Sequence, residues 1–447
     1  MNLVAVAFLA AIGSAAHLTE VQRKALPDAS TTILRKFAFG SGNDQDAEQF
    51  MWSKIAARQP QLFLSLGNNI YADEIAYEFK SITKGFDRDA PPYLLREKYQ
   101  KQLNNSDYVD FLSSTPIIGV WDDHDYGRND AGSEFPFREE SQQLFLDFLG
   151  EPRDSVRRSQ AGIYTSYTFG TDAKSVKVIL LDYRFHRDPY LSLHPNDPSF
   201  KGSDGDNLGD SQWRWLEEEL RSSKATFNII ASTVQVLPND RWFGTESWSI
   251  FPAARERLLD VIQLSHASGV ILLSGNVEFA EINQVSCGDD DAYRLTEVTS
   301  SGLTHSYLQG SGLFHFISAL AYTIVNAILP WYYRADPTVH YGGSNFGQVV
   351  FDWESSPPKA SVSVIDRRGR TRMETSIPAT RFSGTNDSIG CAPLQLPSPG
   401  DYMVRILTVM SLFVLIFGSM IVNVIVVVVV PLQVLRGALF QTKPKTD

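Results

Sequence analysis

The sequence predicts a layered α/β fold in which reactive side chains follow the ends of buried strands. Short apolar runs of strand length alternate along the chain with segments of helical pattern. Hydrophobic residues make up 43% of the 447 residues, an ordinary share for a globular protein. Several of the apolar runs are followed directly by Asp, Asn or His. This alternation is typical of sheets covered by helices, with functional residues on the loops at the strand ends.

The predicted elements follow from the periodicity of each segment. Residues 46–58 begin with a capping pattern and predict a helix, as do the strongly helical residues 210–220. Residues 189–209 are rich in Gly, Pro, Asp and Ser, and we expect a long surface loop near the site. Strands are predicted at 34–39, 62–66, 116–120, 166–169, 176–181, 227–231, 270–273, 348–351 and 360–365.

The two ends of the chain predict a membrane protein. Residues 1–16 contain a short apolar stretch that ends in small residues, which is typical of a cleaved signal peptide. Residues 406–430 are uncharged and, at about 1.5 Å per residue, long enough to cross a hydrocarbon core of about 30 Å. Residues 431–447 carry mostly basic charge and are therefore expected in the cytosol. We expect a single-pass type I protein of the secretory pathway or cell surface, with residues 30–395 lumenal or extracellular.

That location makes two other features meaningful. Asn104 and Asn386 each begin a glycosylation sequon that would face an oxidising compartment. The only two cysteines, Cys287 and Cys391, could form a disulfide there or remain as buried free thiols.

The charge of the chain limits its partners. A formal net charge of −11 argues against binding a polyanion along the whole surface, so we expect no nucleic-acid partner, although a local cationic site is compatible with it. Residues 313–333 are largely apolar, but a second membrane crossing there would separate 345–347 from the rest of the core. We expect a buried helix or one that lies on a membrane surface.

The densest cluster of reactive groups follows the predicted strand 116–120. Asp122, Asp123, His124 and Asp125 place three carboxylates and an imidazole side by side. Such groups resist desolvation at the end of a buried strand unless a cation or a substrate compensates their charge. The cluster is therefore a candidate metal site, and the alternative is a solvated acidic turn.

Six strings in one order give the chain a family resemblance. It resembles the PhoD-like alkaline phosphatases over about 37–351, and the strings stand at 39–44, 66–73, 121–127, 181–184, 273–281 and 299–306. The resemblance implies a metallophosphoesterase-type fold, a four-layer β-sandwich flanked by helices. It also implies that the chain hydrolyses phosphate esters with a metal-activated water.

The same resemblance implies roles for individual residues. His124, Arg184 and Asn129 would serve the reaction, Arg184 by holding phosphate oxygens through its planar fork of donors. Arg184 could instead pair with Asp182 or Asp188. Tyr71, which the resemblance implies as a metal ligand through its phenolate, could instead simply fill the core. The residues implied at the metal centre are Asp122, Asp123, Tyr71, Asn68, Asn276 and Glu278.

Four positions depart from the family pattern. Gly42 stands where the family has Cys, Asn68 and Asn276 where it has Asp, and Glu278 where it has His. Three formal negative charges at these positions become one, which disfavours a tight multi-metal centre. We predict a divalent metal in a weakened site, calcium, magnesium or manganese before iron or zinc, or no metal at all. The alternative function is an inactive pseudophosphatase that binds a phosphorylated ligand or a protein partner.

Overall fold

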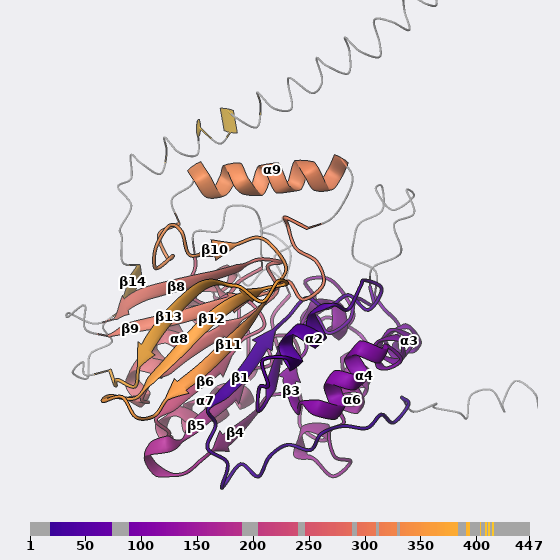
Figure 1. Ribbon diagram of the computed structural model, residues 1–447, viewed down its shortest axis with the longest axis horizontal. Coiled ribbons are helices and arrows are strands. Elements are labelled where there is room, and N and C mark those ends of the chain that lie inside the picture. Colours follow the sequence, from indigo (N-terminus) through magenta and orange to yellow (C-terminus); the bar gives the residue numbers. More distant parts are fainter. Residues whose placement is uncertain are drawn as a thin grey trace, which may run out of the picture. The chain divides into compact units, whose positions relative to one another are not determined.

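The computed structural model describes residues 18–73, 89–189, 204–239, 246–287, 293–309, 313–328, 331–382 and 390–393, with the isolated residues 403, 407, 408, 410, 411 and 414. The chain divides into two compact units, 1–319 with 333–394, and 320–332 with 395–447. The first unit holds both sheets and the candidate site (Figure 1). The predicted signal peptide, the predicted tail and most of the predicted membrane helix at 406–430 lie outside the described residues.

The first sheet has six strands in the order β13-β12-β11-β1-β2-β3. Its strands β1, β2 and β3 are parallel, whereas β11, β12 and β13 form antiparallel hairpins that join the sheet beside β1. The bounds are β1 (Lys36–Gly40), β2 (Phe63–Leu66), β3 (Ile117–Val120), β11 (Asn345–Asp352), β12 (Lys359–Asp366) and β13 (Thr371–Pro378).

The second sheet has eight strands, seven in the order β10-β8-β9-β7-β6-β5-β4, with β14 paired to β8. Its strands β5, β6, β7 and β9 are parallel neighbours, and β4 and β8 are antiparallel to theirs. The bounds are β4 (Thr165–Phe169), β5 (Val176–Leu180), β6 (Phe227–Ala231), β7 (Val270–Ser274), β8 (Ala280–Cys287), β9 (Arg294–Ser300), β10 (His340–Tyr341) and β14 (Cys391–Pro393).

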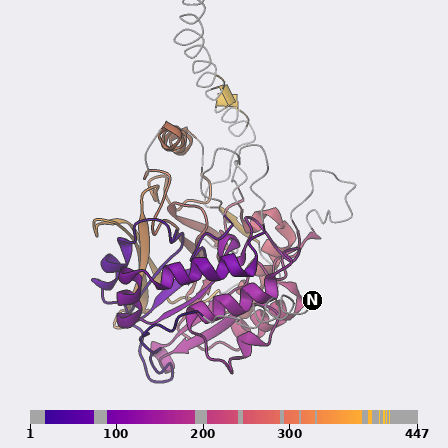
Figure 2. The ribbon, with the colours of Figure 1, turned by 90° about the vertical axis from the view of Figure 1, so that its right-hand side faces the viewer.

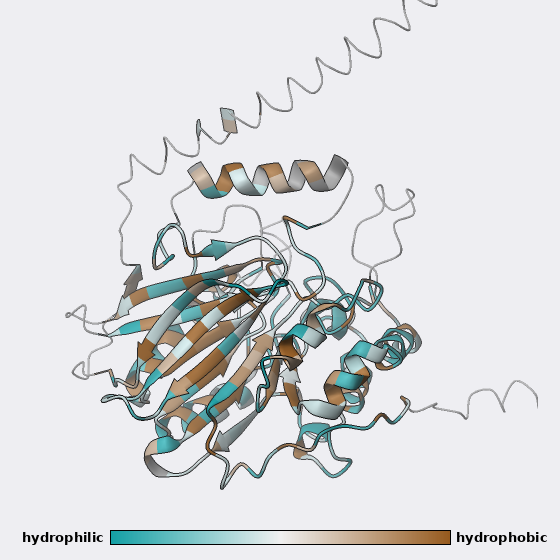
Figure 3. Ribbon diagram, in the orientation of Figure 1, coloured by the Kyte–Doolittle hydropathy of each residue, from teal (hydrophilic) through white to brown (hydrophobic). Residues whose placement is uncertain are grey.

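The two sheets pack face to face through apolar side chains. The rings of Phe227 on β6 and Phe351 on β11 lie 5.1 Å apart and join the sheets. Along β5, Val176, Val178 and Leu180 belong to this central core, because alternate residues of a strand face the same side. The strands of both sheets carry many hydrophobic residues, with polar ones interspersed among them (Figure 3).

Helices cover the outer faces of the sheets. Lys177 of β5 points away from the core and binds Glu219 at 2.8 Å, which places α7 (Gly209–Arg221) on that side with α8 (Pro252–Ser265). On the first sheet, Trp52 of α2 packs on Phe63 of β2 at 5.5 Å. Figures 1 and 2 show the helices of the first sheet gathered beside β1 to β3: α2 (Met51–Ala56), α3 (Pro92–Leu103), α4 (Ser106–Ser114) and α6 (Arg138–Leu149).

Shorter helical segments connect these layers. The four-residue helix α5 (Asp123–Tyr126) follows β3, and α9 (Leu313–Ile328) follows the loop after β9. Among the described residues, three turns are 3-10 helices, at Val156–Arg158, Asp172–Lys174 and Trp248–Ile250.

The predicted α/β class is confirmed, and each predicted strand overlaps an observed one. Sequence patterns missed β8, β9, β13 and the short strands β10 and β14. In β8 and β9 buried polar residues interrupt the apolar pattern, and protein partners satisfy them. Glu281 of β8 accepts from the guanidinium of Arg334 at 2.9 Å, and Glu297 of β9 accepts from the backbone of Val236 and Leu237 at 2.8 and 2.9 Å.

Two further expectations concern the cysteines and the membrane. Cys287 and Cys391 form a disulfide between β8 and β14, as one of the two alternatives predicted.

In the part of the chain that the structure describes, helices are too short or too polar to span a bilayer. Helix α9 is not fully buried, because Phe316 and Leu320 are 64% and 41% exposed.

Candidate functional site

The site forms where the carboxyl ends of the parallel strands of both sheets meet. A parallel bridge between Ser41, after β1, and Ser301, after β9, joins the two sheets at this edge. The segments after β2, β3, β5 and β7 begin there with Gly67, Trp121, Leu181 and Gly275. Parallel strands therefore bring residues from distant parts of the sequence to one place.

Close backbone approach sets the position of Asp122. Gly67 has φ +92, and a Cβ atom on it would lie 2.5 Å from the Cβ of Asp122 and 2.9 Å from its backbone nitrogen. Only glycine fits between the turn after β2 and the start of the Trp121 segment.

Arg184 lies at the centre of a buried ion cluster. Its side chain is fully buried, and its Nε donates to Asp122 at 2.8 Å while Nη1 donates to Glu246 at 2.6 Å. Nη1 also donates to the carbonyl of Ala131 at 3.3 Å, and Nη2 donates to both Asp122 and Glu246. These bonds use all five N–H groups of the guanidinium, so no N–H remains for a phosphate oxygen.

The side chain of Arg184 binds neither of the two acidic partners, Asp182 and Asp188, that the sequence suggested as alternatives. Its backbone N–H donates to Asp182 at 2.9 Å, but its side chain pairs with Asp122 and Glu246. The carboxylate of Asp182 instead accepts from the Trp121 indole at 2.9 Å and from the backbone of Ile163 at 2.8 Å. Asp182 thereby fixes the loop that carries Arg184.

Beside this pair, three carboxylates form a candidate metal centre. Oxygens of Asp123, Asp130 and Glu246 lie within 4.8 Å of one another. The backbone N–H of Asp130 donates to Oδ2 of Asp123 at 3.1 Å, which holds the two residues together. The other oxygen of Asp123, Oδ1, is buried and accepts no hydrogen bond from any described residue.

The electrostatics show that this cluster is short of positive charge. Burial, with the nearby carboxylates of Glu246 and Asp123, raises the pKa of Asp130 to about 7. Burial also raises the pKa of Asp122, against the opposing effect of Arg184. Burial would also raise the pKa of Asp123. The opposing effects of His124, Arg184 and backbone donors are larger, so the pKa of Asp123 is lowered.

Asn68 and Asn276 meet beside the carboxylates. Both have left-handed backbones, with φ 50 and φ 70, and Nδ2 of Asn68 donates to Oδ1 of Asn276 at 3.3 Å. Nδ2 of Asn276 donates to Glu246 at 3.3 Å. The two amides at changed family positions thus bind each other and the acidic cluster.

A second set of side chains surrounds His124. Its Nδ1 lies 2.7 Å from Asp73, and its ring centroid lies 4.3 Å from that of Tyr71. The phenol of Tyr71 lies 3.0 Å from Nε2 of His305, and Glu278 lies 3.6 Å from the same nitrogen. Glu278 keeps a 43% exposed side chain, and its hydrogen bond to His305 lowers its pKa although burial opposes this.

The structure therefore brings together most of the residues that the sequence singled out. Asp122, Asp123, Arg184, Asn68 and Asn276 share one contact network, and His124, Tyr71 and Glu278 share the neighbouring one. Asn129 is half-buried, and none of the hydrogen bonds seen among described residues ties its side chain to either network.

Sequence reasoning missed Asp130, Glu246, Asp73 and His305. Asp73 and His305 lie inside two of the motif strings, and Asp130 follows Asn129, so attention to the other polar residues there would have found them. Glu246 lies outside every string, and only the packing of its loop against Arg184 reveals it.

Comparisons with known proteins identify the family of the chain. A sequence model described as PhoD-like phosphatase matches residues 37–361. The chain belongs to the PhoD-like phosphatase family. Members of this family depend on metal, and the three carboxylates supply the oxygen ligands that hard divalent cations prefer.

Individual relatives are more distant. The chain is 27% identical to alkaline phosphatase D of Bacillus subtilis over 215 residues, which are 41% of this chain and 34% of that protein. A solved structure of PhoD shares the fold, with a TM-score of 0.59 and 16% identity over 84% of this chain and 74% of that one. The GAP50 anchor of the Plasmodium inner membrane complex aligns with a TM-score of 0.41 and 13% identity, over 78% of this chain and 90% of that one. The match to alkaline phosphatase D spans about a third of that protein's length.

Proposed function

We propose that this PhoD-like protein is a phosphate ester hydrolase that works with one divalent cation held by Asp123, Asp130 and Glu246. The observation that carries the proposal is the group of three carboxylates whose oxygens lie within 4.8 Å of one another. The buried Oδ1 of Asp123 accepts no hydrogen bond from a described residue, and Nη2 of Arg184 lies 3.9 Å from it. A buried carboxylate oxygen without a donor is costly, and a cation removes that cost.

The balance of charge supports one cation rather than two. When ionised, Asp122, Asp123, Asp130 and Glu246 carry four negative charges. Arg184 and Arg187 offset two of them, since Arg187 lies 3.9 Å from Glu246. Two negative charges remain, which one divalent ion balances. Burial is the main cause of the raised pKa values of Asp122 and Asp130, and the neighbouring carboxylates add to it.

The chemistry divides between the cation and the protein. When bound, a divalent cation polarises phosphoryl oxygens and activates water at neutral pH. Asp73 fixes Nδ1 of His124, so this imidazole would exchange a proton with the ester through Nε2. Arg184 would act as a positioning residue that aligns Asp122 and Glu246, because its own donors are already used.

Hydrolysis by the full-length chain tests this function. Phosphomonoesters and phosphodiesters would be assayed with calcium, magnesium, manganese, iron and zinc in turn. D123N removes a proposed ligand, and D110N makes the same change at an exposed position of α4. We expect activity in the wild type and in D110N and its loss in D123N. Equal activity in D123N would contradict the proposal.

A noncatalytic role is the second candidate, and one contact favours it. The Asn68–Asn276 hydrogen bond replaces two of the anionic ligands that a two-metal centre would need. A pseudophosphatase would bind a phosphorylated ligand or a protein partner without turnover. It predicts no hydrolysis with any metal, together with binding of a phosphate ester that D123N or N276A weakens.

We also propose that residues 406–430 anchor the chain in a membrane of the secretory pathway, with the phosphatase domain on the lumenal side. The uncharged run and the basic residues after it support this location. Endoglycosidase treatment of protein from secretory membranes tests it. A mobility shift that depends on Asn104 and Asn386 is expected, and extraction of the chain by alkaline carbonate would contradict the anchor.

A further inference from the structure

A basic pocket lies at the turn that joins β12 to β13, apart from the acidic cluster. We propose that this arginine pocket, formed by Arg367, Arg368, Arg370 and Arg372, binds a phosphate group of an anionic ligand. It does not depend on the proposed hydrolase activity. The turn lies just beyond residues 37–361, the segment that the PhoD-like family model matches.

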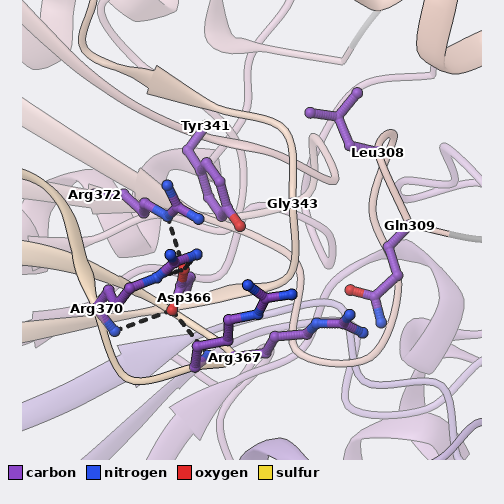
Figure 4. A pocket seen from close by; sticks show the side chains of 9 residues that line it. Leu308, Gln309, Tyr341, Gly343, Asp366, Arg367, Arg370 and Arg372 are labelled. Carbon is purple, nitrogen blue, oxygen red and sulfur yellow. Dashed lines mark hydrogen bonds and ion pairs between the residues drawn. The ribbon is translucent and has the colours of Figure 1, made fainter.

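One buried carboxylate builds the turn. Asp366 is 1% exposed, and its Oδ1 accepts from the backbone N–H groups of Arg368 at 2.8 Å and Arg370 at 3.0 Å. Its Oδ2 accepts from Nε of Arg370 at 3.0 Å and Nε of Arg372 at 2.8 Å. Asp366 thereby fixes both the backbone of the turn and two of its guanidiniums (Figure 4).

The charge of the pocket is strongly unbalanced. Four arginines and a single acidic residue line it, which leaves three positive charges around one cavity of a chain whose net charge is −11. Arg370 and Arg372 share one oxygen of Asp366, and the side chains of Arg367 and Arg368 pair with no acidic group among the described residues. Like charges held this close repel one another unless an anion lies between them.

The size of the pocket favours a small, highly charged group. Its volume is about 270 Å³, at the lower end for ligand cavities. Besides the arginines it is lined by Gln309 and Tyr341, and the guanidinium of Arg372 lies 4.8 Å from the centre of the Tyr341 ring. This stacking restricts Arg372, so less side-chain entropy is lost when it binds a ligand.

The donor chemistry favours phosphate over other anions. Guanidiniums match the oxygen spacing of phosphate with paired hydrogen bonds, and several of them together suit a doubly charged phosphomonoester. A single small pocket does not follow an extended backbone, so nucleic acid does not fit it. The phosphate could belong to a lipid headgroup or to a soluble molecule, and the experiment has to separate these two sources.

The test measures anion binding by the full-length chain in the presence of EDTA, so that no metal at Asp123 can hold phosphate. Inorganic pyrophosphate is titrated calorimetrically. In parallel, binding is measured to phosphatidylcholine vesicles with and without a phosphatidylinositol bisphosphate. The variant is R367Q/R368Q, because these two exposed side chains make no hydrogen bond within the described fold. The control R294Q/R381Q makes the same change from arginine to glutamine at two exposed positions outside the pocket.

We expect the wild type and the control to bind at least one probe, and the R367Q/R368Q variant to bind it about tenfold more weakly or worse. Binding to pyrophosphate supports a soluble phosphate, and binding only to the phosphoinositide vesicles supports a lipid headgroup. Three results would overturn the proposal. They are no binding by the wild type, equal loss in the control, and binding that survives in R367Q/R368Q but is lost in D123N.

Discussion

Arg184 shows how one buried residue can hold together the carboxylates of the candidate site. Its fully buried guanidinium binds Asp122 and Glu246, so its removal leaves buried carboxylates without a counter-ion. We expect R184M to lower the free energy of unfolding by about 3–5 kcal/mol, measured by denaturant titration.

The matched control for R184M is R221M, which breaks an exposed pair with Glu218 on α7. Exposed pairs contribute little, so this change should cost less than about 1 kcal/mol. Equal losses in the two variants would show that the Arg184 cluster contributes no more than a surface ion pair.

Asp130 should make stability depend on pH when divalent cations are absent. Its folded pKa, raised to about 7 from 3.8, means that the folded state binds the proton more tightly than the unfolded state does. The stability that this proton contributes is complete below pH 3.8 and is lost as the pH rises through about 7. D130N lacks the proton site.

The measurement is the difference in free energy of unfolding between wild type and D130N, followed across that pH range in EDTA. Subtraction cancels carboxylates that do not interact with Asp130, such as Asp125, whose pKa burial raises to about 6. The wild type should lose stability relative to D130N with rising pH. A flat difference would refute the raised pKa.

At the residue scale, the sequence showed where the site is but not which contacts form it. Asp122, Asp123 and Arg184 were predicted from strings that end strands, and strand ends converge by topology. Arg184 was expected to hold phosphate oxygens, with pairing to its near neighbours Asp182 or Asp188 as the alternative. Glu246 is the actual side-chain partner together with Asp122, and it comes from a loop that only tertiary packing brings close.

At the scale of elements, the turn after β2 determines the position of the acidic segment after β3. G67A introduces a Cβ atom 2.5 Å from Asp122 and also strains a residue with φ +92. G369A is the control, since Gly369 has φ +76 and its nearest neighbour, a flexible arginine, is 3.8 Å away.

We expect G369A to cost about 1 kcal/mol of stability, from backbone strain alone. G67A should cost more and also weaken metal binding, because Asp122 has to move. Thermal unfolding and metal titration check both. If the two variants behave alike, the turn does not control Asp122.

The elements themselves were predictable where hydrophobicity alone marks them. Strand β7 begins with a continuous buried apolar run, and β5 and β6 each contain a single polar residue, Lys177 and Asn228, among apolar ones. Their predicted bounds therefore differ from the observed ones by at most a residue. Strand β13 could not be found this way, because its outer residues are exposed and polar and few apolar residues remain to form a pattern.

At the scale of the whole molecule, the disulfide closes a long loop. It joins residues 104 positions apart and holds β14 against β8. Closing a loop of this length stabilises a fold by up to about 4 kcal/mol, chiefly by restricting the unfolded chain. We expect reduction to lower the unfolding midpoint of the wild type and to leave C287S/C391S unchanged. An effect of reductant on both proteins would point to another cause.

The proposed site centres on the buried acidic cluster of Asp123, Asp130 and Glu246, which we propose holds one divalent cation. The most direct measurement is the metal content of the full-length chain after dialysis against trace metal, with D123N and D110N beside it. We predict one divalent ion per chain in the wild type and in D110N, and none in D123N. Two ions per chain, or the same content in D123N as in the wild type, would contradict it.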